Sequence, residues 1–287
     1  MIALILGAGG QLGSALRTLK PEDVALVARD VPQLDLTDPK EIERTIADVK
    51  PDVVINAAAY TAVDKAETEV ELAFRVNASG AASVAHSAEI HNARMIQVST
   101  DYVFDGKKSS PYRTDDPAAP LSVYGKSKFA GEQAALANCQ NCLVVRTAWL
   151  YSGEGSNFVK TMLKHMASSP AVRVVDDQVG TPTCARSLAQ ALWDLARTDC
   201  RGVLHYTDTG VASWYDFACA IQEEAVTLGL LEKAVSVQPI PTRSFPRPAP
   251  RPPYSVLEKE NTWAALNRSA NHWRKNLREM LGRIRNE

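Results

Sequence analysis

The sequence predicts an α/β protein in which a Rossmann-type, doubly wound parallel sheet is followed by a smaller C-terminal α+β lobe. Short apolar runs alternate with helical stretches over the first half of the chain. A glycine cluster directly follows the first of these runs, and the alternation changes beyond about Trp149. Runs that are apolar at consecutive positions are typical of parallel strands buried on both faces.

Strand–helix alternation implies right-handed βαβ units, so the first half is expected to form the sheet and its covering helices. The expected strands are Ile2–Leu6, Val24–Ala28, Val53–Ala57, Met95–Ser99 and Leu143–Arg146. The expected helices are Gln11–Leu19, Pro39–Val49, roughly Asp64–His91, and Tyr124–Ala137.

The second half is expected to form mainly the smaller lobe. We place the division near residue 150, with a first domain at 1–150 and a lobe at 151–287, from which the chain can cross back. Ser213 and Asp216 have the spacing of a helix capping box. The expected elements are helices at Asn157–Ala167, Arg186–Arg197 and Ser213–Leu228, an isolated strand at Val203–Tyr206, and a helical tail from about Glu258.

The charge and composition exclude several classes of protein. The net charge is −1, so no global basic field attracts nucleic acid or anionic lipid. No apolar run approaches the roughly 18 residues of a membrane span. The chain begins with an apolar strand and lacks a basic leader, so we expect a cytoplasmic protein.

The cysteines and histidines give no sign of a disulfide framework or a metal site. The cysteine count of five is odd, and Cys139 and Cys142 form an isolated C-x-x-C at the end of a helical stretch. A structural role is expected for this pair, because a redox motif normally opens a helix and a zinc site needs a second pair. The five histidines are scattered.

A glycine-rich turn, Gly7-Ala-Gly-Gly10-Gln-Leu-Gly13, lies between the first expected strand and the first expected helix. Glycine permits the tight turn and lets the backbone approach a pyrophosphate, while the helix N-terminus offers free N–H groups and a positive dipole. This placement predicts a dinucleotide cofactor.

The residues after the second strand bear on which nicotinamide cofactor is used. Asp30 has the position of the acidic residue that accepts from the adenosine ribose, which favours NADH. Arg29 beside it could instead meet the 2′-phosphate of NADPH, so both cofactors stay open. Asp35 and Leu36 are expected to border the adenine.

Tyr124 and Lys128 form a Y-x-x-x-K at the start of a helical stretch, which puts both side chains on one helix face. A nearby ammonium favours the phenolate, so we expect Lys128 to lower the pKa of Tyr124. Thr100 ends a central strand, where its hydroxyl can hydrogen-bond a substrate carbonyl. The trio predicts acid–base catalysis beside a nicotinamide.

The sequence resembles the extended short-chain dehydrogenase/reductase family, and more narrowly the dTDP-4-dehydrorhamnose reductases, over nearly its whole length. The residues that carry the resemblance are Gly7–Gly13, NAAAYTAVDKAE at Asn56–Glu67, Asn77, STDYVF at Ser99–Phe104, YGKSK at Tyr124–Lys128, RTAWLY at Arg146–Tyr151, NFVKTML at Asn157–Leu163, DQVGTPT at Asp177–Thr183, and SFPRPAPRPPYSVL near the C-terminus.

The resemblance implies NADH- or NADPH-dependent reduction of the C4 keto group of dTDP-4-dehydro-L-rhamnose to dTDP-L-rhamnose, the last step of dTDP-L-rhamnose synthesis. Thr100, Tyr124 and Lys128 would be catalytic. The cofactor would contact Gly7, Gly10, Gln11, Leu12, Gly13, Arg29, Asp30, Asp35, Leu36, Ala59, Tyr60, Thr61, Asn77, Tyr124 and Lys128. The substrate would contact Thr100, Asp101, Tyr102, Trp149, Asn157 and Arg251.

Two departures refine this expectation. Tyr102 stands where the related 4,6-dehydratases carry a glutamate used in water elimination, which favours simple reduction. Ala15 and Arg186 stand where some family members carry glutamates that bind magnesium at a dimer interface. We therefore expect no metal site, and a monomer or weak homodimer.

Two alternative functions stay open, one of them non-catalytic. The chain could reduce another dTDP-4-keto-deoxysugar, or it could be a non-catalytic NAD(P)-binding regulatory subunit.

The proline-dense segment Pro239–Pro253 is predicted to be a linker or a rigid loop near a ligand. Within it Arg251 is the residue expected to meet the substrate diphosphate.

Overall fold

The main sheet of the computed structural model has six parallel strands in the order β10-β5-β4-β3-β1-β2. The model describes residues 1–286. Chain order reverses between β1 and β3, which is where doubly wound sheets bind their ligands. The strands are β1 (Ile2–Leu6), β2 (Ala25–Arg29), β3 (Val53–Asn56), β4 (Arg94–Thr100), β5 (Cys142–Thr147) and β10 (Gly202–His205).

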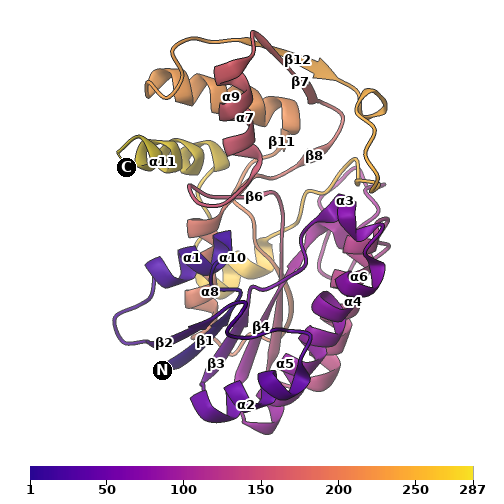
Figure 1. Cartoon of the computed structure of the whole chain (residues 1–287), viewed down its shortest axis with the longest axis vertical. Coiled ribbons are helices and arrows are strands. Elements are labelled where there is room, and N and C mark those ends of the chain that lie inside the picture. Colours follow the sequence, from indigo (N-terminus) through magenta and orange to yellow (C-terminus); the bar gives the residue numbers. More distant parts are fainter. Residues whose placement is uncertain (287) are drawn as a thin grey trace.

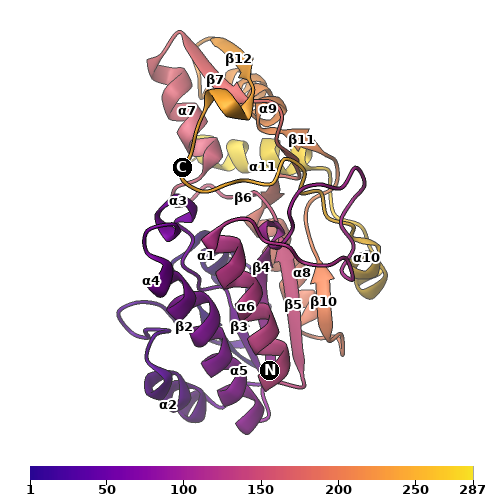
Figure 2. The ribbon, with the colours of Figure 1, turned by 90° about the vertical axis from the view of Figure 1, so that its right-hand side faces the viewer.

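Helices cover both faces of this sheet (Figures 1 and 2). Alternate side chains of each strand point to opposite faces, so Ile5 joins the core on one face and Leu4 the core on the other. The Rossmann-type fold predicted from the sequence is confirmed. On one face lie α1 (Gln11–Thr18) and α8 (Ala185–Leu195); on the other lie α2 (Pro39–Val49), α5 (Ala81–Ile90) and α6 (Val123–Asn138).

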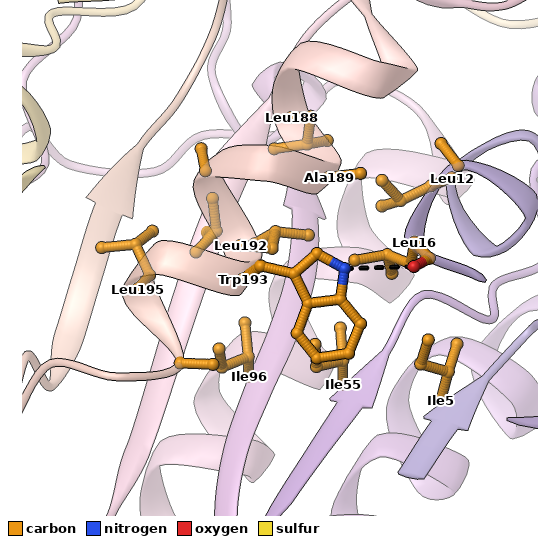
Figure 3. Packing of buried hydrophobic residues seen from close by; sticks show 14 of the residues in the cluster. Ile5, Leu12, Leu16, Ile55, Ile96, Leu188, Ala189, Leu192, Trp193 and Leu195 are labelled. Atoms are coloured by element: carbon orange, nitrogen blue, oxygen red, sulfur yellow. Dashed lines mark hydrogen bonds between the residues drawn. The ribbon is translucent and has the colours of Figure 1, made fainter. Parts of the chain in front are cut away.

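The chain crosses back to the main sheet after residue 150. Trp193 of α8 is fully buried, and its indole N–H donates to the backbone oxygen of Leu16 in α1 at 3.1 Å (Figure 3). The strand expected to be isolated at Val203–Tyr206 is instead β10, the edge strand of the main sheet. It pairs in parallel with β5, because that strand has an edge left unpaired by β4 to which Gly202–His205 can hydrogen-bond. The domain division at residue 150 stays a prediction.

A second apolar core holds the rest of the second half together. The helices α7 (Phe158–Ser168), α9 (Trp214–Thr227) and α11 (Trp273–Asn286) pack there beside paired short strands, β7 (Ala171–Val175) with β12 (Ser236–Ile240). The capping box at Ser213 and Asp216 is present. The remaining elements are the short pairs β6 (Leu150–Tyr151) with β9 (Thr183–Cys184) and β8 (Val179–Gly180) with β11 (Ala212–Ser213), and helix α10 (Glu260–Leu266).

The long helix expected over Asp64–His91 is interrupted. It consists of α3 (Val63–Ala66), α4 (Val70–Phe74), a π-helical turn at Arg75–Gly80, and α5. In the π turn the Asn77 side chain accepts from the Tyr60 N–H at 2.8 Å and donates to Ser127 Oγ at 3.0 Å. Wide turns of this kind accompany sites where a side chain is redirected, and here the redirected amide fastens a loop to α6.

None of the helices within residues 1–286 is long and apolar enough to cross a membrane.

Candidate active site

A cleft of about 740 Å³ opens at the carboxyl ends of the central strands. Ends of β1, β2, β3, β4 and β5 all contribute to it, and its volume is typical of a small-molecule site. The aromatic rings of Trp149 and Trp214 close the end that faces the second core. The cleft therefore lies at the switch point of the sheet and continues toward the second half of the chain.

The glycine-rich turn forms the floor of the cleft at the N-terminus of α1. The first turn of this helix has neither a side-chain cap nor an acidic residue, so its amides remain available to an anion. A Cβ at Gly13 would lie 2.1 Å from the Gly7 backbone oxygen. Gly13 thus allows the helix to start close to the strand, whereas a Cβ at Gly10 would meet only the Gly7 backbone oxygen, at 3.5 Å. These features fit the pyrophosphate of a dinucleotide.

Asp30, at the end of β2, is tied to the glycine turn. Its carboxylate accepts from the Gly9 N–H at 2.5 Å and from the Val31 N–H at 2.8 Å. Arg29 lines the same end of the cleft and donates to the Ala28 carbonyl at 3.1 Å. The acidic residue therefore shapes the turn and borders the place where an adenosine ribose would lie.

Thr100, Tyr124 and Lys128 converge in the middle of the cleft. Thr100 ends β4, donates to the Asp101 carboxylate at 3.0 Å and accepts from the Tyr102 N–H at 3.2 Å. Tyr124 and Lys128 lie one turn apart on α6. The Lys128 ammonium donates to the Val98 carbonyl at 2.7 Å, which fixes it against β4.

Burial decides the protonation of these groups. Burial, with a smaller effect from Asp101, raises the pKa of Tyr124 to about 12, and the Thr100 hydroxyl offsets only part of this. Burial lowers the pKa of Lys128 to about 8. The expectation that Lys128 lowers the Tyr124 pKa is therefore wrong for the chain without ligands, because desolvation of the phenolate dominates. Tyr124 carries its proton at neutral pH, as a proton donor must.

A buried ion pair supports this helix from behind. Glu132, one turn beyond Lys128, accepts from Arg146 of β5 at 2.7, 2.9 and 3.1 Å, and both side chains are almost fully buried. The negative charge of Glu132 raises the pKa of Lys128 and so opposes the effect of burial. Burial and the Arg146 charge lower the pKa of neighbouring His205 to about 3, so His205 stays neutral.

Asp101 lies beside the trio with 2% of its surface exposed. Burial raises its pKa to about 6, against the lowering effect of hydrogen bonds from Ser255 and Thr100. Its ring neighbours are Tyr102 and Tyr124, which pack edge to face with centroids 5.5 Å apart. The middle of the cleft thus places hydroxyl, phenol and carboxyl groups where they are shielded from solvent.

Most of the residues expected at the site line the cleft, and five do not. Gly13 packs beneath the turn, and the Tyr60 hydroxyl donates to Glu69 at 2.6 Å. The cleft is lined by the expected residues Gly7, Gly10, Gln11, Leu12, Arg29, Asp30, Asp35, Leu36, Ala59, Thr61, Thr100, Asp101, Tyr102, Tyr124, Lys128 and Trp149. Those outside its lining are Gly13, Tyr60, Asn77, Asn157 and Arg251.

Asn157 and Asn77 have structural partners in place of ligands. Asn157 caps α7 through the Lys160 N–H and donates to Gln11 Oε1 at 2.9 Å, which links α7 to the start of α1. Asn77 holds the Tyr60 loop through two backbone hydrogen bonds. Both side chains position loops around the cleft, and their expected ligand contacts stay predictions.

Arg251 is engaged by a carboxylate from the first half of the chain. Its guanidinium donates to both oxygens of Asp64 at 3.0 Å and to the Ala249 carbonyl at 3.0 Å. It also interacts with Tyr102, which lines the cleft. The proline-dense segment is therefore a loop packed beside the site, and a diphosphate would have to compete with Asp64 for Arg251.

Trp214 is the main lining residue that the sequence did not indicate. It is the first residue of α9 and lies far from Trp149 in the chain, so no local pattern connects the two. The capping box at Ser213 shows only that a helix starts here. Gly155 and Ser156 also line the cleft, from the loop before α7.

The model of the RmlD substrate binding domain family matches residues 1–286. The chain belongs to this family. A dTDP-4-dehydrorhamnose reductase of Aggregatibacter actinomycetemcomitans is 40% identical, with 96% of this chain and 97% of that protein covered. A probable dTDP-4,6-dihydroxy-2-methyloxan-3-one 4-ketoreductase of Streptomyces antibioticus is 41% identical, with 96% and 93% covered.

A solved structure of an RmlD-like protein has the same fold. The dTDP-4-dehydrorhamnose reductase of Bacillus anthracis in complex with NADP superposes with a TM-score of 0.92 at 35% identity, covering 97% of this chain and 98% of that one. In this RmlD-family chain the described residues contain no group of three or more His, Cys, Asp or Glu side chains placed to hold a metal ion.

Proposed function

We propose that this chain is an NAD(P)H-dependent dTDP-4-dehydrorhamnose reductase, which converts the C4 ketone of dTDP-4-dehydro-L-rhamnose to the alcohol of dTDP-L-rhamnose. One observation carries the proposal: Thr100, Tyr124 and Lys128 meet in one cleft beyond a free helix N-terminus. Relatives named for this reaction cover nearly the full chain, and one of them binds NADP.

The cofactor would lie along the glycine turn, with its adenosine near Asp30 and Arg29 and its nicotinamide ribose near Lys128. When bound, it supplies the hydride for the sugar C4 carbon. The chain supplies the proton. Tyr124, protonated at neutral pH because burial raises the pKa, donates to the C4 oxygen as negative charge develops there.

Thr100 and Lys128 assist this proton transfer. The Thr100 hydroxyl donates to Asp101 and accepts from the Tyr102 N–H in the chain without substrate; with substrate bound it would turn its one proton from Asp101 to the C4 oxygen. The Lys128 ammonium stabilises negative charge on the Tyr124 oxygen once the proton has left. The surroundings of Asp101 are buried, so water does not screen the Thr100 hydrogen bond or the Lys128 charge, and both act more strongly.

The deoxysugar nucleotide would extend toward Trp149 and Trp214, which offer aromatic faces to a sugar or base. The proposal keeps the division at residue 150, with the cofactor mainly on 1–150 and substrate choice mainly on 151–287. It also keeps a cytoplasmic location, and a monomer or weak homodimer without a metal.

A second candidate is a reductase of another dTDP-4-keto-deoxysugar. The probable ketoreductase of Streptomyces antibioticus favours it, since its 41% identity to this chain lies within the 35–44% of the relatives named dTDP-4-dehydrorhamnose reductase. Product identity separates the two. Purified protein is incubated with NADPH or NADH and a panel of dTDP-4-keto sugars, and C4 stereochemistry is read by NMR.

Tyr124→Phe is the catalytic control. It should lower kcat by about two to four orders of magnitude, as expected for loss of a general acid, and leave cofactor affinity nearly unchanged. Turnover close to that of the wild type in Tyr124→Phe would refute the assignment. Cofactor binding without turnover on every keto sugar would instead point to a regulatory subunit.

A further inference from the structure

A second cavity, of about 240 Å³, shares no lining residue with the active-site cleft. It is bordered by Leu19 after α1, the first turn of α8, the segment Arg268–Asn271 and the helix α11. In the view of Figure 1, α11 lies above α1 and α8. The cavity therefore lies where the second core meets a helix pair of the main sheet.

Three arginines and one carboxylate, that of Glu279, line this cavity, and two of the arginines are in no ion pair among the described residues. Arg268 is paired with Asp194. Within residues 1–286, neither Arg186 nor Arg283 forms an ion pair within 4 Å. By contrast Arg274 and Arg278 of the same α11 each pair with a glutamate of α9. Two adjacent cations without partners leave a local excess of positive charge in a chain with a net charge of −1.

The surroundings strengthen this excess. Arg186 and Arg283 line the same cavity, and burial together with the like charge of Arg283 lowers the pKa of Arg186. Arg186 belongs to the first turn of α8, a helix of 11 residues with no acidic residue in that turn. The positive end of the helix dipole thus adds to the two side-chain charges. Ser187, Gln190 and Asn271 also line the cavity, each with a hydrogen-bond partner within the protein.

We propose that this cavity binds a small inorganic oxyanion, namely phosphate or pyrophosphate, between Arg186 and Arg283. Guanidinium groups bind phosphate oxygens through paired, charge-assisted hydrogen bonds. The volume is below the roughly 300–1,000 Å³ typical of sites for larger organic ligands, so the cavity suits the free anion rather than a nucleotide sugar.

Two carboxylates lie near the cavity, and one of them, that of Glu279, allows a substitution that should raise the affinity for an anion. Glu279 lines the cavity from α11, one turn before Arg283, without an ion pair to either arginine. The carboxylate of Asp208 accepts a hydrogen bond from the Cys184 N–H at 3.0 Å. Burial raises the pKa of Asp208 to about 6. Glu279 repels an anion in the cavity, so its neutralisation should tighten binding.

The test is calorimetric titration of pyrophosphate, and separately of inorganic phosphate, into the full chain saturated with NADP⁺, so that the glycine turn is already occupied. We expect one site, with affinity lowered about tenfold or more in Arg186→Gln and in Arg283→Gln. Glu279→Gln should bind more tightly than the wild type. Arg285→Gln removes an equal charge from α11 outside the cavity and should bind like the wild type.

The proposal is overturned if Arg186→Gln and Arg283→Gln bind pyrophosphate as the wild type does while circular dichroism shows them folded. An equal loss in Arg285→Gln would also overturn it, since general surface charge would then explain binding. In a further arm with dTMP, which the substrate cleft also binds under the proposed function, the part of the binding that Arg186→Gln removes should be no tighter than that of phosphate; a tighter Arg186-dependent part would reject a free-anion site in favour of a nucleotide site. None of these readouts depends on turnover.

Discussion

Trp149 and Trp214 stack face to face at the end of the cleft, with ring centroids 3.6 Å apart and planes 5° from parallel. Trp149 follows β5 and has a left-handed backbone with φ of 48°. Its ring lies so close to Gly180 that a Cβ there would be 2.6 Å away. The stack therefore joins the end of the main sheet to the start of α9 and forms an aromatic wall at this end of the cleft.

Loss of one ring of this stack should weaken substrate binding. Trp214→Ala removes a stacking partner worth about 0.5–1.5 kcal/mol, so KM for the sugar nucleotide should rise about three- to tenfold. Trp214→Phe should retain most of the affinity. The Kd of NADPH should stay within about twofold in both. Steady-state kinetics and cofactor titration measure these values, and an unchanged KM in Trp214→Ala would show that the substrate does not use this wall.

The pH dependence of kcat/KM should report Lys128. Burial lowers its pKa to about 8, whereas Tyr124 holds its proton to about pH 12. Lys128 is charged below pH 8 and loses its proton above it, so kcat/KM should fall as pH rises through about 8. A profile that stays flat to about pH 10 would contradict a role for the ammonium.

The same shift has a consequence for stability. The folded-state pKa of Lys128 lies below its unfolded value, so the unfolded chain binds more protons between about pH 8 and 10.5. This group therefore destabilises the fold below pH 8, and the penalty fades as pH rises through that window. Lys128→Met should remove this contribution, and urea unfolding of both proteins at pH 7 and pH 10 measures the difference.

Cofactor preference should depend on the two residues at the end of β2. Asp30→Ala removes a negative charge that repels a 2′-phosphate, so the ratio of kcat/KM values should shift toward NADPH. Arg29→Ala should shift it toward NADH. Asp30 also holds the Gly9 N–H, so Asp30→Asn serves as the control that keeps an acceptor in place. If neither charge substitution moves the ratio, the adenosine ribose lies elsewhere.

Arg251 and Asp64 should affect substrate binding in opposite directions. If Arg251 pairs with the diphosphate, Arg251→Ala should raise KM about tenfold or more, since a charged hydrogen bond is worth about 1.5–3 kcal/mol. Asp64→Asn should lower KM, because it weakens the competing partner. Thermal unfolding provides the control: loss of stability in both variants with unchanged KM would mean that the pair only fastens the proline-dense loop.

The sequence by itself determined the Rossmann half of the protein and the centre of its site. Consecutive apolar residues in the strands require burial on both faces, and a glycine turn before a helix has few other uses. The Tyr124–Lys128 spacing places both groups on one helix face whatever surrounds the helix. These features are local, so they can be read from neighbouring residues.

Tertiary structure decided what depends on contacts between distant segments. Whether Val203–Tyr206 joins the main sheet depends on the open edge of β5, and whether Arg251 is free depends on Asp64, which comes from the first half of the chain. The pKa of Tyr124 follows from burial, which residue spacing cannot reveal. The pairing of Trp149 with Trp214 likewise arises only when two halves of the chain pack together, because side-chain packing is long-range in sequence although it is short-range in space.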